Sequence, residues 1–312
     1  MLQQTRVESV IGYFNRFMER FPTPRDLAEA ELDELMGYWA GLGYYARARN
    51  LHAGATQVVE RHGGRVPDDP EAFAALKGVG RYTCGAVQSI AFGRPLSVLD
   101  GNVIRVISRL DYVTEDPKLS ATNKALWRRA DDLLDPDRPG DFNQAMMELG
   151  ATVCTPRAPK CLLCPLNTHC QVLREGEPES LPMKTKRKKR PQYDVIAALS
   201  ETEDNRIWLG LRPTSGLLGG LWSLPSVRSE HPDSLAEMGL RCGDEIAQIQ
   251  HGFTHQVWSV RLYRATGRPQ SDQFDRFSAF TVSEIAHLGL AGPSLKALRA
   301  AGVKLPHRRG AG

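Results

Sequence analysis

Apolar residues recur every three or four positions at several places in the first half of the chain. The clearest run extends from Val7 to Phe21 and ends at Pro22. This spacing places the apolar side chains on one face of an α-helix, and proline stops a helix because it has no amide hydrogen. Residues 45–62 and 120–134 show the same period. The first part of the chain is therefore predicted to be all-α.

The pattern changes in the last third of the chain. Residues 193–200, 206–211 and 256–264 form short apolar or alternating runs bounded by Gly, Pro or Asp, as is typical of β-strands. Residues 292–301 return to the helical period. The pattern predicts an α+β domain at the C-terminal end.

A basic run separates the two textures. Residues 184–190 read Lys-Thr-Lys-Arg-Lys-Lys-Arg, with several prolines nearby. So many like charges cannot be buried together, so the run predicts a solvated linker, which either only joins two domains or also contacts phosphates. The expected domains are residues 1–172 and 193–312, joined by a linker over 173–192.

Composition narrows the class of protein. The 312 residues are 41% hydrophobic, which is enough for packed cores, and the net charge is +4. No apolar run approaches the length of a membrane span, and nothing at the start resembles a signal peptide. We therefore expect a cytoplasmic protein that does not enter a membrane. The mild positive charge only hints at a polyanionic partner.

Four cysteines fall within seventeen residues, separated by gaps of six, two and five residues; they are Cys154, Cys161, Cys164 and Cys170. Four thiolates at this spacing can share a zinc ion or an iron–sulfur cluster. Structural zinc usually uses two Cys-x2-Cys pairs, so the gap of six argues against zinc. Disulfides are disfavoured in a long chain with few cysteines. The pattern favours a [4Fe–4S] cluster.

A short glycine turn follows a predicted helix. Asp69-Pro70 is a good helix start, because Asp caps free amides and Pro fits the first turn. The helix is expected to reach Leu76, and Gly78 and Gly80 follow before a second helix begins at Arg81. Glycines let the backbone turn tightly at a helix N-terminus, where amides can bind phosphate. Such turns also simply join helices, so the turn alone decides nothing.

Several motifs together resemble a known family. Leu76-Lys77-Gly78-Val79-Gly80, Leu99-Asp100-Gly101-Asn102-Val103 and the four-cysteine cluster are similar to the helix-hairpin-helix superfamily of DNA glycosylases. Met1-Leu2-Gln3-Gln4-Thr5, Gly41-Leu42-Gly43-Tyr44-Tyr45 and Phe142-Asn143-Gln144-Ala145 resemble its MutY-type adenine glycosylases. The resemblance covers nearly the whole chain. It implies base-excision repair by a monomer associated with the nucleoid, in which adenine mispaired with 8-oxoguanine or guanine is excised from duplex DNA.

The resemblance also implies a catalytic centre. Asp100 matches the catalytic aspartate, whose carboxylate stabilises the positive charge that develops on the sugar. Asn102 is expected to orient that site. Asp100 could instead simply cap the helix that begins at Gly101. Tyr82 stands where lyase relatives of the endonuclease III type have a Schiff-base lysine, so hydrolysis without strand cleavage is expected.

Other matched residues are expected to contact DNA once the target base has been flipped out. The resemblance implies that Leu2 and Gln144 line the adenine pocket, that Gln4 wedges into the duplex and that Tyr44 supports the oxidised guanine. Gly78 and Gly80 would bring the hairpin to the phosphates. Arg47 and Arg49, in contrast, could contact phosphate or be solvated.

The C-terminal part resembles the Nudix-related domain that ends MutY-type proteins. The resemblance rests on Trp208–Pro213 and on Leu218–Pro225. No cluster of glutamates suited to magnesium follows, so pyrophosphatase activity is not expected. Phe253-Thr254-His255 is similar to the family's Phe-Ser-His loop, which reads 8-oxoguanine, although it could be ordinary strand packing. Thr254 keeps a hydroxyl that can bond to a base edge.

One expected residue falls outside the sequence. The family's general acid is a glutamate two residues before the Met that is Met1 here. The resemblance therefore predicts a chain truncated before that glutamate, and three alternatives remain. The true start could lie upstream, the chain could bind lesions without catalysis, or it could be an endonuclease III-like glycosylase and lyase.

Overall fold

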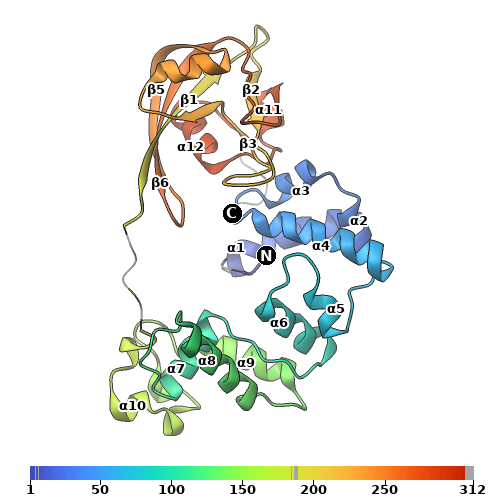
Figure 1. Ribbon diagram of the computed structural model, residues 1–312, viewed down its shortest axis with the longest axis vertical. Coiled ribbons are helices and arrows are strands. Elements are labelled where there is room, and N and C mark those ends of the chain that lie inside the picture. Colours follow the sequence, from blue (N-terminus) through green and yellow to red (C-terminus); the bar gives the residue numbers. More distant parts are fainter. Residues whose placement is uncertain (4, 6, 184, 186–188, 306–312) are drawn as a thin grey trace. The chain divides into compact units, whose positions relative to one another are not determined.

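The computed structural model describes residues 1–305 except 4, 6, 184 and 186–188, and the fold forms two compact units (Figure 1). The first unit combines Met1–Gly64 with the residues from Lys189 onward, and the second is Arg65–Lys188. The first 64 residues therefore group with the C-terminal domain, and the units do not follow the order of the chain. The break after Lys188 falls inside the expected linker.

Four helices open the first unit. The helix expected from Val7 is confirmed, and so is the helix expected over residues 45–62. Phe17, Phe21 and Trp39 are buried together, so the apolar stripe of the first helix faces a core made with the helices that follow. The bounds are α1 (Val7–Arg20), α2 (Pro24–Ala28), α3 (Leu32–Trp39) and α4 (Ala46–His62).

Two sheets complete the first unit. In the four-stranded sheet the order is β4-β1-β6-β5, with β1 parallel to β6 and antiparallel to β4; the three-stranded sheet has the order β3-β2-β7. The three expected strands are confirmed as β1, β2 and β6. The strands are β1 (Gln192–Ser200), β2 (Ile207–Leu211), β3 (Trp222–Ser223), β4 (Ser226–Arg228), β5 (Arg241–Gly252), β6 (Val257–Thr266) and β7 (Arg276–Phe280).

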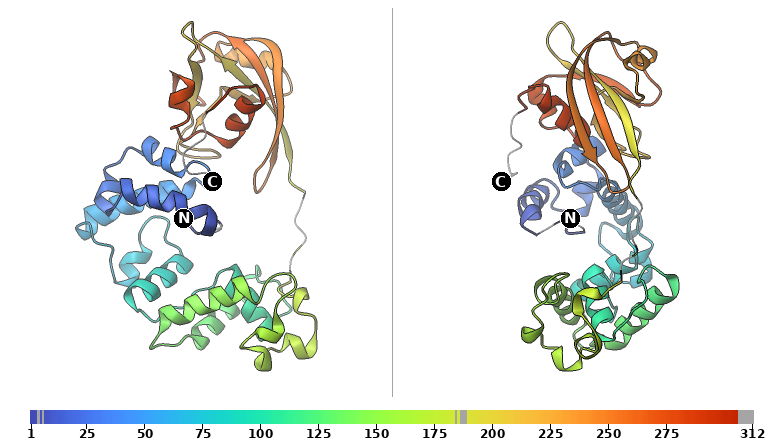
Figure 2. Two further views of the ribbon diagram at one scale, coloured as in Figure 1. Left: turned by 180° about the vertical axis from the view of Figure 1, so that it is seen from behind. Right: turned by 90° about the vertical axis from the view of Figure 1, so that its left-hand side faces the viewer.

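Strand β1 is buried on both faces. Val195 and Ala197 share a core with α12 (Gly292–Ala300), whereas Ile196 and Ala198 pack with the 3₁₀ helix η4 (Pro232–Met238). Figure 2 shows α12 beside the sheet in both views. A central strand covered on two sides reads as a continuous apolar run rather than an alternating one, which is why β1 was recognisable in the sequence.

Strand β5 was not expected. It is an edge strand with two register irregularities near Glu245, and many of its residues are polar and exposed. An edge strand interrupted in this way has little of the alternation that marks a half-buried strand. Helix α11 (Val282–Ile285) was not expected either; it begins with a capping box formed by Thr281 and Glu284.

The N-terminal helices share a core with the C-terminal sheets. Trp222 of β3 donates its indole N–H to the carboxylate of Asp33 in α3 at 2.8 Å, across 189 positions of sequence. Its neighbour Leu221 is fully buried in the same apolar cluster as Met36. Arg49 of α4 donates to the carbonyl oxygen of Gly219 at 2.6 Å. These contacts explain why the two segments form one unit.

The second unit is helical. The helix expected over residues 120–134 is confirmed, but the helix after Asp69 is shorter than expected. It ends at Ala74, because the Leu76 amide bonds to the Phe73 carbonyl and the chain tightens into a turn. The bounds are α5 (Pro70–Ala74), α6 (Arg81–Phe92), α7 (Gly101–Leu110), α8 (Ser120–Leu133), α9 (Pro139–Thr152), η1 (Cys161–Leu163), η2 (Asn167–His169), α10 (Val172–Glu175) and η3 (Pro178–Ser180).

Part of the expected linker is ordered. Helix α10 and the 3₁₀ helix η3 lie at its start, and Leu181 is buried. Most of the basic run falls outside the described residues. Among the described residues, no helix is both long and apolar enough to cross a membrane.

Candidate functional site

The glycine hairpin is built as a turn between two helices of the second unit. The Val79 amide bonds to the Leu76 carbonyl at 3.1 Å, and Gly78 lies between them with φ of 83°. A residue with side chain is strained at this φ, so glycine is required here. Gly80 is the N-cap of α6 and provides no side-chain cap. The first amides of α6 therefore have no side-chain cap, as a phosphate-binding helix N-terminus requires.

Asp100 is fixed at the N-terminus of α7. Its Oδ1 accepts hydrogen bonds from the amides of Asn102 at 2.9 Å and Val103 at 2.8 Å, and its Oδ2 accepts one from Asn102 Nδ2 at 3.1 Å. Asp100 is therefore the N-cap of α7, and the Asn102 side chain donates to its carboxylate; neither contact tests the catalytic role. Asp100 remains partly exposed. A carboxylate held by three donors and open to one side can face a developing cation.

Tyr82 of α6 lies near this carboxylate. Burial raises the pKa of the Tyr82 phenol, and the nearby charge of Asp100 raises it further. The hydroxyl lies 3.5 Å from the sulfur of Met147, so the phenol stays neutral in a largely apolar setting. A phenol has no amine nitrogen, so Tyr82 cannot form a Schiff base with a sugar.

Arg105 connects this site to the cysteine-rich loop. From Arg105, Nη2 donates to Asn102 Oδ1 at 2.9 Å and to the Gly150 carbonyl at 2.6 Å, while Nε donates to the Cys154 carbonyl at 2.7 Å. The side chain is buried, and burial lowers its pKa. Gly150 is needed because a Cβ there would come within 2.6 Å of the Asn102 side chain. A continuous series of hydrogen bonds therefore runs from Asp100 through Asn102 and Arg105 to the Cys154 carbonyl.

Arg109, one turn further along α7, is also buried and contacts the cysteines. Its Nη1 lies 3.3 Å from the sulfur of Cys154 and donates to the Thr155 carbonyl at 2.8 Å. Its Nε donates to the Leu181 carbonyl at 3.0 Å, and its own carbonyl lies 3.5 Å from the sulfur of Cys170. One arginine thus joins both ends of the four-cysteine segment to α7.

The four cysteines lie in the segment between α9 and α10. Burial raises the pKa of Cys161 and of Cys170, and the nearby Cys154 and Cys164 raise it further. No group of three or more His, Cys, Asp or Glu side chains in the described part of the chain is arranged to hold a metal ion. A [4Fe–4S] cluster is held by four cysteine thiolates. The donor set fits such a cluster.

The expected DNA-contacting residues are divided between the units. Leu2 and Tyr44 are exposed in the first unit, and Tyr44 has an unusual φ of 48°. Gln144 is exposed on α9 in the second unit, where its side chain donates to the Gly140 carbonyl. Gln4 lies outside the described residues.

Phe253, Thr254 and His255 form the tight turn between β5 and β6. The Phe253 amide bonds to the Gln256 carbonyl at 2.8 Å, and the Thr254 and His255 side chains are exposed. The Phe253 ring packs between His251, at 4.6 Å between centroids, and Trp258, at 4.9 Å. The turn is therefore packed at its base and exposed at its tip. Phe253 fits the strand-packing interpretation, whereas Thr254 and His255 are free to meet a base.

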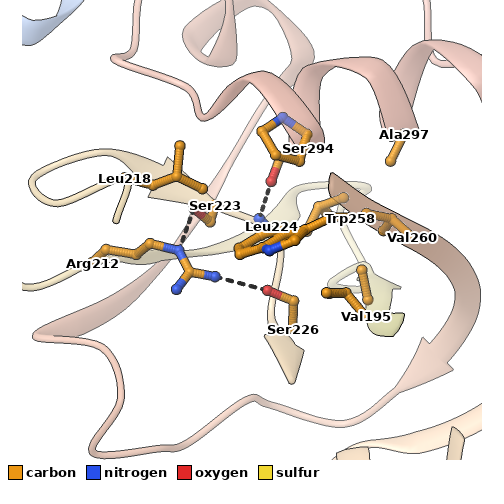
Figure 3. A pocket seen from close by; sticks show the side chains of 12 residues that line it. Val195, Arg212, Leu218, Ser223, Leu224, Ser226, Trp258, Val260, Ser294 and Ala297 are labelled. Carbon is orange, nitrogen blue, oxygen red and sulfur yellow. Dashed lines mark hydrogen bonds between the residues drawn. The ribbon is translucent and has the colours of Figure 1, made fainter. Parts of the chain in front are cut away.

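A small cavity lies among the C-terminal strands of the first unit (Figure 3). Arg212 points along its edge, with Nε bonded to Ser223 and Nη2 to Ser226, both at 2.9 Å. Burial, helped by the nearby Arg228, lowers the pKa of Arg212 to about 10. The cavity volume is about 10 Å³, which holds no more than a water molecule. This cavity is too small to be a nucleotide site.

Comparison with known proteins agrees with this geometry. The family model described as HhH-GPD superfamily base excision DNA repair protein matches residues 1–131, and the NUDIX domain model matches residues 196–300. The adenine DNA glycosylase of Rattus norvegicus is 37% identical over 99% of this chain and 71% of its own length. The chain belongs to the adenine DNA glycosylase family. Its fold is a helix-hairpin-helix domain followed by a Nudix-like α+β domain.

This chain matches only part of the length of some relatives. The adenine DNA glycosylase of Mus musculus is 38% identical over 85% of this chain, but the match spans only 63% of that protein. A solved thermostable thymine-DNA glycosylase is 32% identical, with a TM-score of 0.50 over 55% of this chain and 80% of its own. The helical part of the chain therefore shares its fold with this solved DNA glycosylase.

Two buried arginines of α7 were not predicted from the sequence. Arg105 and Arg109 stand four positions apart in a helix rich in Val and Ile, and that pattern was the available signal for a buried polar network. For Arg47 and Arg49 the sequence left phosphate contact and solvation open. Both side chains bond to backbone carbonyls within the first unit.

Proposed function

We propose that this protein is a base-excision repair DNA glycosylase that removes adenine mispaired with 8-oxoguanine or guanine in duplex DNA. It would act as a monomer in the cytoplasm, associated with the nucleoid. The observation that carries the proposal is the Asp100 carboxylate, held by Asn102 and Val103 beside Tyr82, in a member of the adenine DNA glycosylase family.

Asp100 would act on the sugar of the flipped nucleotide. As the bond from C1′ to the adenine nitrogen breaks, its electron pair leaves with the base and positive charge develops on the sugar ring. The fixed carboxylate stabilises that charge without having to reorganise. A water molecule then adds to C1′ and loses a proton, which passes through solvent to the departing adenine anion, so that neutral adenine and an abasic site remain.

Tyr82 sets the outcome at this site. An amine here would attack C1′ and lead through a Schiff base to strand cleavage. The Tyr82 hydroxyl is neutral and faces Met147, so water remains the only nucleophile proposed and the reaction ends at hydrolysis. The enzyme would therefore be monofunctional.

Duplex recognition would use both units. The uncapped amides at Gly80 suit a phosphate, and Gln144 and Leu2 would line the adenine pocket. Tyr44 and the turn of Phe253, Thr254 and His255 would contact the oxidised guanine. The exposed hydroxyl of Thr254 supports this assignment, because it can bond to a base edge that guanine and 8-oxoguanine present differently.

Cys154, Cys161, Cys164 and Cys170 would hold a [4Fe–4S] cluster. When bound, the cluster would supply a rigid cross-link of the loop and no redox chemistry. Arg109 supports this role, because it already ties Cys154 and Leu181 of the linker to α7. The exposed Arg157 and Lys160 lie on the same loop and could reach phosphates.

The test is adenine excision by the 312-residue chain from duplexes that differ only in the base opposite adenine. Single-turnover assays would compare adenine opposite 8-oxoguanine, adenine opposite guanine and a normal pair, with strand cleavage scored only after alkali. Tight binding of the lesion duplex without excision would favour a lesion-binding protein instead. A borohydride-trapped covalent adduct would favour an endonuclease III-like lyase.

A further inference from the structure

Arg47 of α4 joins two backbone segments of the first unit. Its Nη1 donates to the carbonyl of Met1 at 2.9 Å and also to the carbonyl of Gln3. Its Nη2 donates to Thr5 Oγ1 at 3.3 Å. The same guanidinium therefore holds the N-terminal segment at three residues, Met1, Gln3 and Thr5.

The other contacts of Arg47 are with the loop that precedes α4. Nη2 also approaches the carbonyls of Gly43 at 3.2 Å and Leu42 at 3.4 Å. The guanidinium carbon lies 5.5 Å from the ring centroids of both Trp39 and Tyr44. Trp39 is buried and donates its own N–H to the Gly43 carbonyl at 3.2 Å, so the base of the loop is rigid.

Arginine suits this place for a physical reason. Its planar fork presents five N–H groups in fixed directions, and its face can stack on aromatic rings. The partners found here are neutral oxygens and rings, and burial lowers the pKa of the guanidinium. A cation that bonds to carbonyl oxygens, and to no carboxylate among the described residues, serves to order the backbone rather than to balance a charge.

We propose that Arg47 is a positioning residue that locks the N-terminal segment to the Tyr44 loop, so that both meet the duplex as one rigid surface. The inference rests on the proposed function, which assigns Leu2 and Tyr44 to the DNA. Because the guanidinium of Arg47 bonds to backbone carbonyls and to Thr5 of the first unit, it would affect how the duplex is engaged and distorted rather than the step at C1′.

Arg49 provides a matched control. It is also a partly buried arginine of α4 with a pKa lowered by burial, and it also donates to a backbone carbonyl, that of Gly219. Among the described residues, its side chain bonds to neither the N-terminal segment nor the Tyr44 loop. Arg47→Gln and Arg49→Gln therefore remove comparable groups with different expected consequences, and Arg47→Lys tests whether charge alone is enough.

The first measurement is hydrogen–deuterium exchange of the free full chain. Arg47→Gln is expected to raise exchange in peptides covering residues 1–5 and 42–46 about tenfold or more, because several bonds to a charged group are lost. Arg47→Lys should resemble Arg47→Gln, since an ammonium cannot span these acceptors. Arg49→Gln should leave both peptides unchanged. Unchanged exchange in Arg47→Gln would overturn the inference.

The second measurement separates engagement from chemistry. In single-turnover excision of adenine opposite 8-oxoguanine, Arg47→Gln should raise the half-saturating enzyme concentration about tenfold and change the saturating rate less than about threefold. Wild-type binding should increase the fluorescence of a neighbouring 2-aminopurine, which reports unstacking. This increase should be smaller for Arg47→Gln. If Arg49→Gln gives the same changes, the effect is general packing and the inference fails. If the wild-type chain neither binds the lesion duplex nor excises adenine, but exchange still rises in Arg47→Gln, the proposed function fails. The inference that Arg47 holds the N-terminal segment to the Tyr44 loop is then still supported.

Discussion

The guanidinium of Arg105 donates a 2.9 Å hydrogen bond to the side-chain oxygen of Asn102, the residue whose amide groups hold Asp100. The same guanidinium also holds the Cys154 carbonyl. A change at the cysteine loop can therefore alter the orientation of the carboxylate through two side chains, without any electron transfer.

Replacing Arg105 should affect both stability and excision. Arg105→Met leaves the Gly150 and Cys154 carbonyls without their buried donor, and we expect a loss of about 3 kcal/mol in the free energy of unfolding. Arg105→Lys should be more stable than Arg105→Met. It should still excise adenine about tenfold more slowly than wild type, because one ammonium cannot satisfy all the acceptors. Denaturant unfolding and single-turnover rates measure the two effects. Arg138→Lys, at an exposed pair with Asp141, is the control and should change neither.

Two substitutions at Asp100 separate its capping role from its catalytic role. Asparagine caps a helix about as well as aspartate, so Asp100→Asn should leave stability nearly unchanged, whereas Asp100→Ala should lose about 1 kcal/mol. Both should lower the excision rate at least about a hundredfold, because neither carries the charge that faces the sugar. A melting curve and a single-turnover assay of each variant are sufficient. Normal excision by Asp100→Asn would remove Asp100 from the mechanism.

Tyr82 should determine whether a covalent intermediate forms. With borohydride, the wild-type chain is expected to give no trapped DNA adduct, and Tyr82→Lys is expected to give a detectable one, because an amine then stands beside Asp100. Gel shift under denaturing conditions measures the adduct. Tyr82→Phe is the control and should give none. Trapping by the wild-type chain would contradict the monofunctional assignment.

Thr254 should affect discrimination and leave the chemistry unchanged. Thr254→Ala removes the exposed hydroxyl, and the preference for adenine opposite 8-oxoguanine over adenine opposite guanine should fall about threefold to tenfold, the effect of one hydrogen bond. Thr254→Ser should retain the preference. Competition between the two duplexes gives the ratio directly. An unchanged ratio in Thr254→Ala would show that the turn does not read the base through this hydroxyl.

The contact between Asp33 and Trp222 predicts a pH dependence of stability. Burial raises the pKa of Asp33, only partly offset by the Trp222 hydrogen bond and by Arg276. The folded state therefore binds a proton at a pH where the unfolded state does not. The contribution of Asp33 is fully present below about pH 4, the ordinary value for aspartate, and is lost as pH rises through the raised pKa.

Asp33→Asn tests this sign. The difference in the free energy of unfolding between wild type and Asp33→Asn should move in favour of wild type as pH falls from 7 through the raised pKa of Asp33. Asn can still accept the Trp222 hydrogen bond, so the fold should survive. Urea unfolding at several pH values measures the difference. A constant difference, or one of opposite slope, would contradict the shift.

Local patterns were enough for the elements and for part of the site. The helices beginning near Val7 and Ser120 and the strand beginning at Gln192 could be predicted because their apolar spacing or continuous burial is a property of adjacent residues. Asp100 could be recognised as a cap because it bonds to the amides of its immediate neighbours. Strand β5 was missed because an irregular edge strand has little periodicity to detect.

The sequence by itself determined the helical hairpin, the capped aspartate and the cysteine spacing, since each depends on residues close along the chain. Only the tertiary structure decided that Asp33 and Trp222 bind the first helices to the last sheets, and that Arg47 and Arg105 order distant backbone. The physical reason is that an arginine has the same local pattern whether it is solvated or buried. Its role depends on which carbonyl oxygens folding brings within reach of the guanidinium.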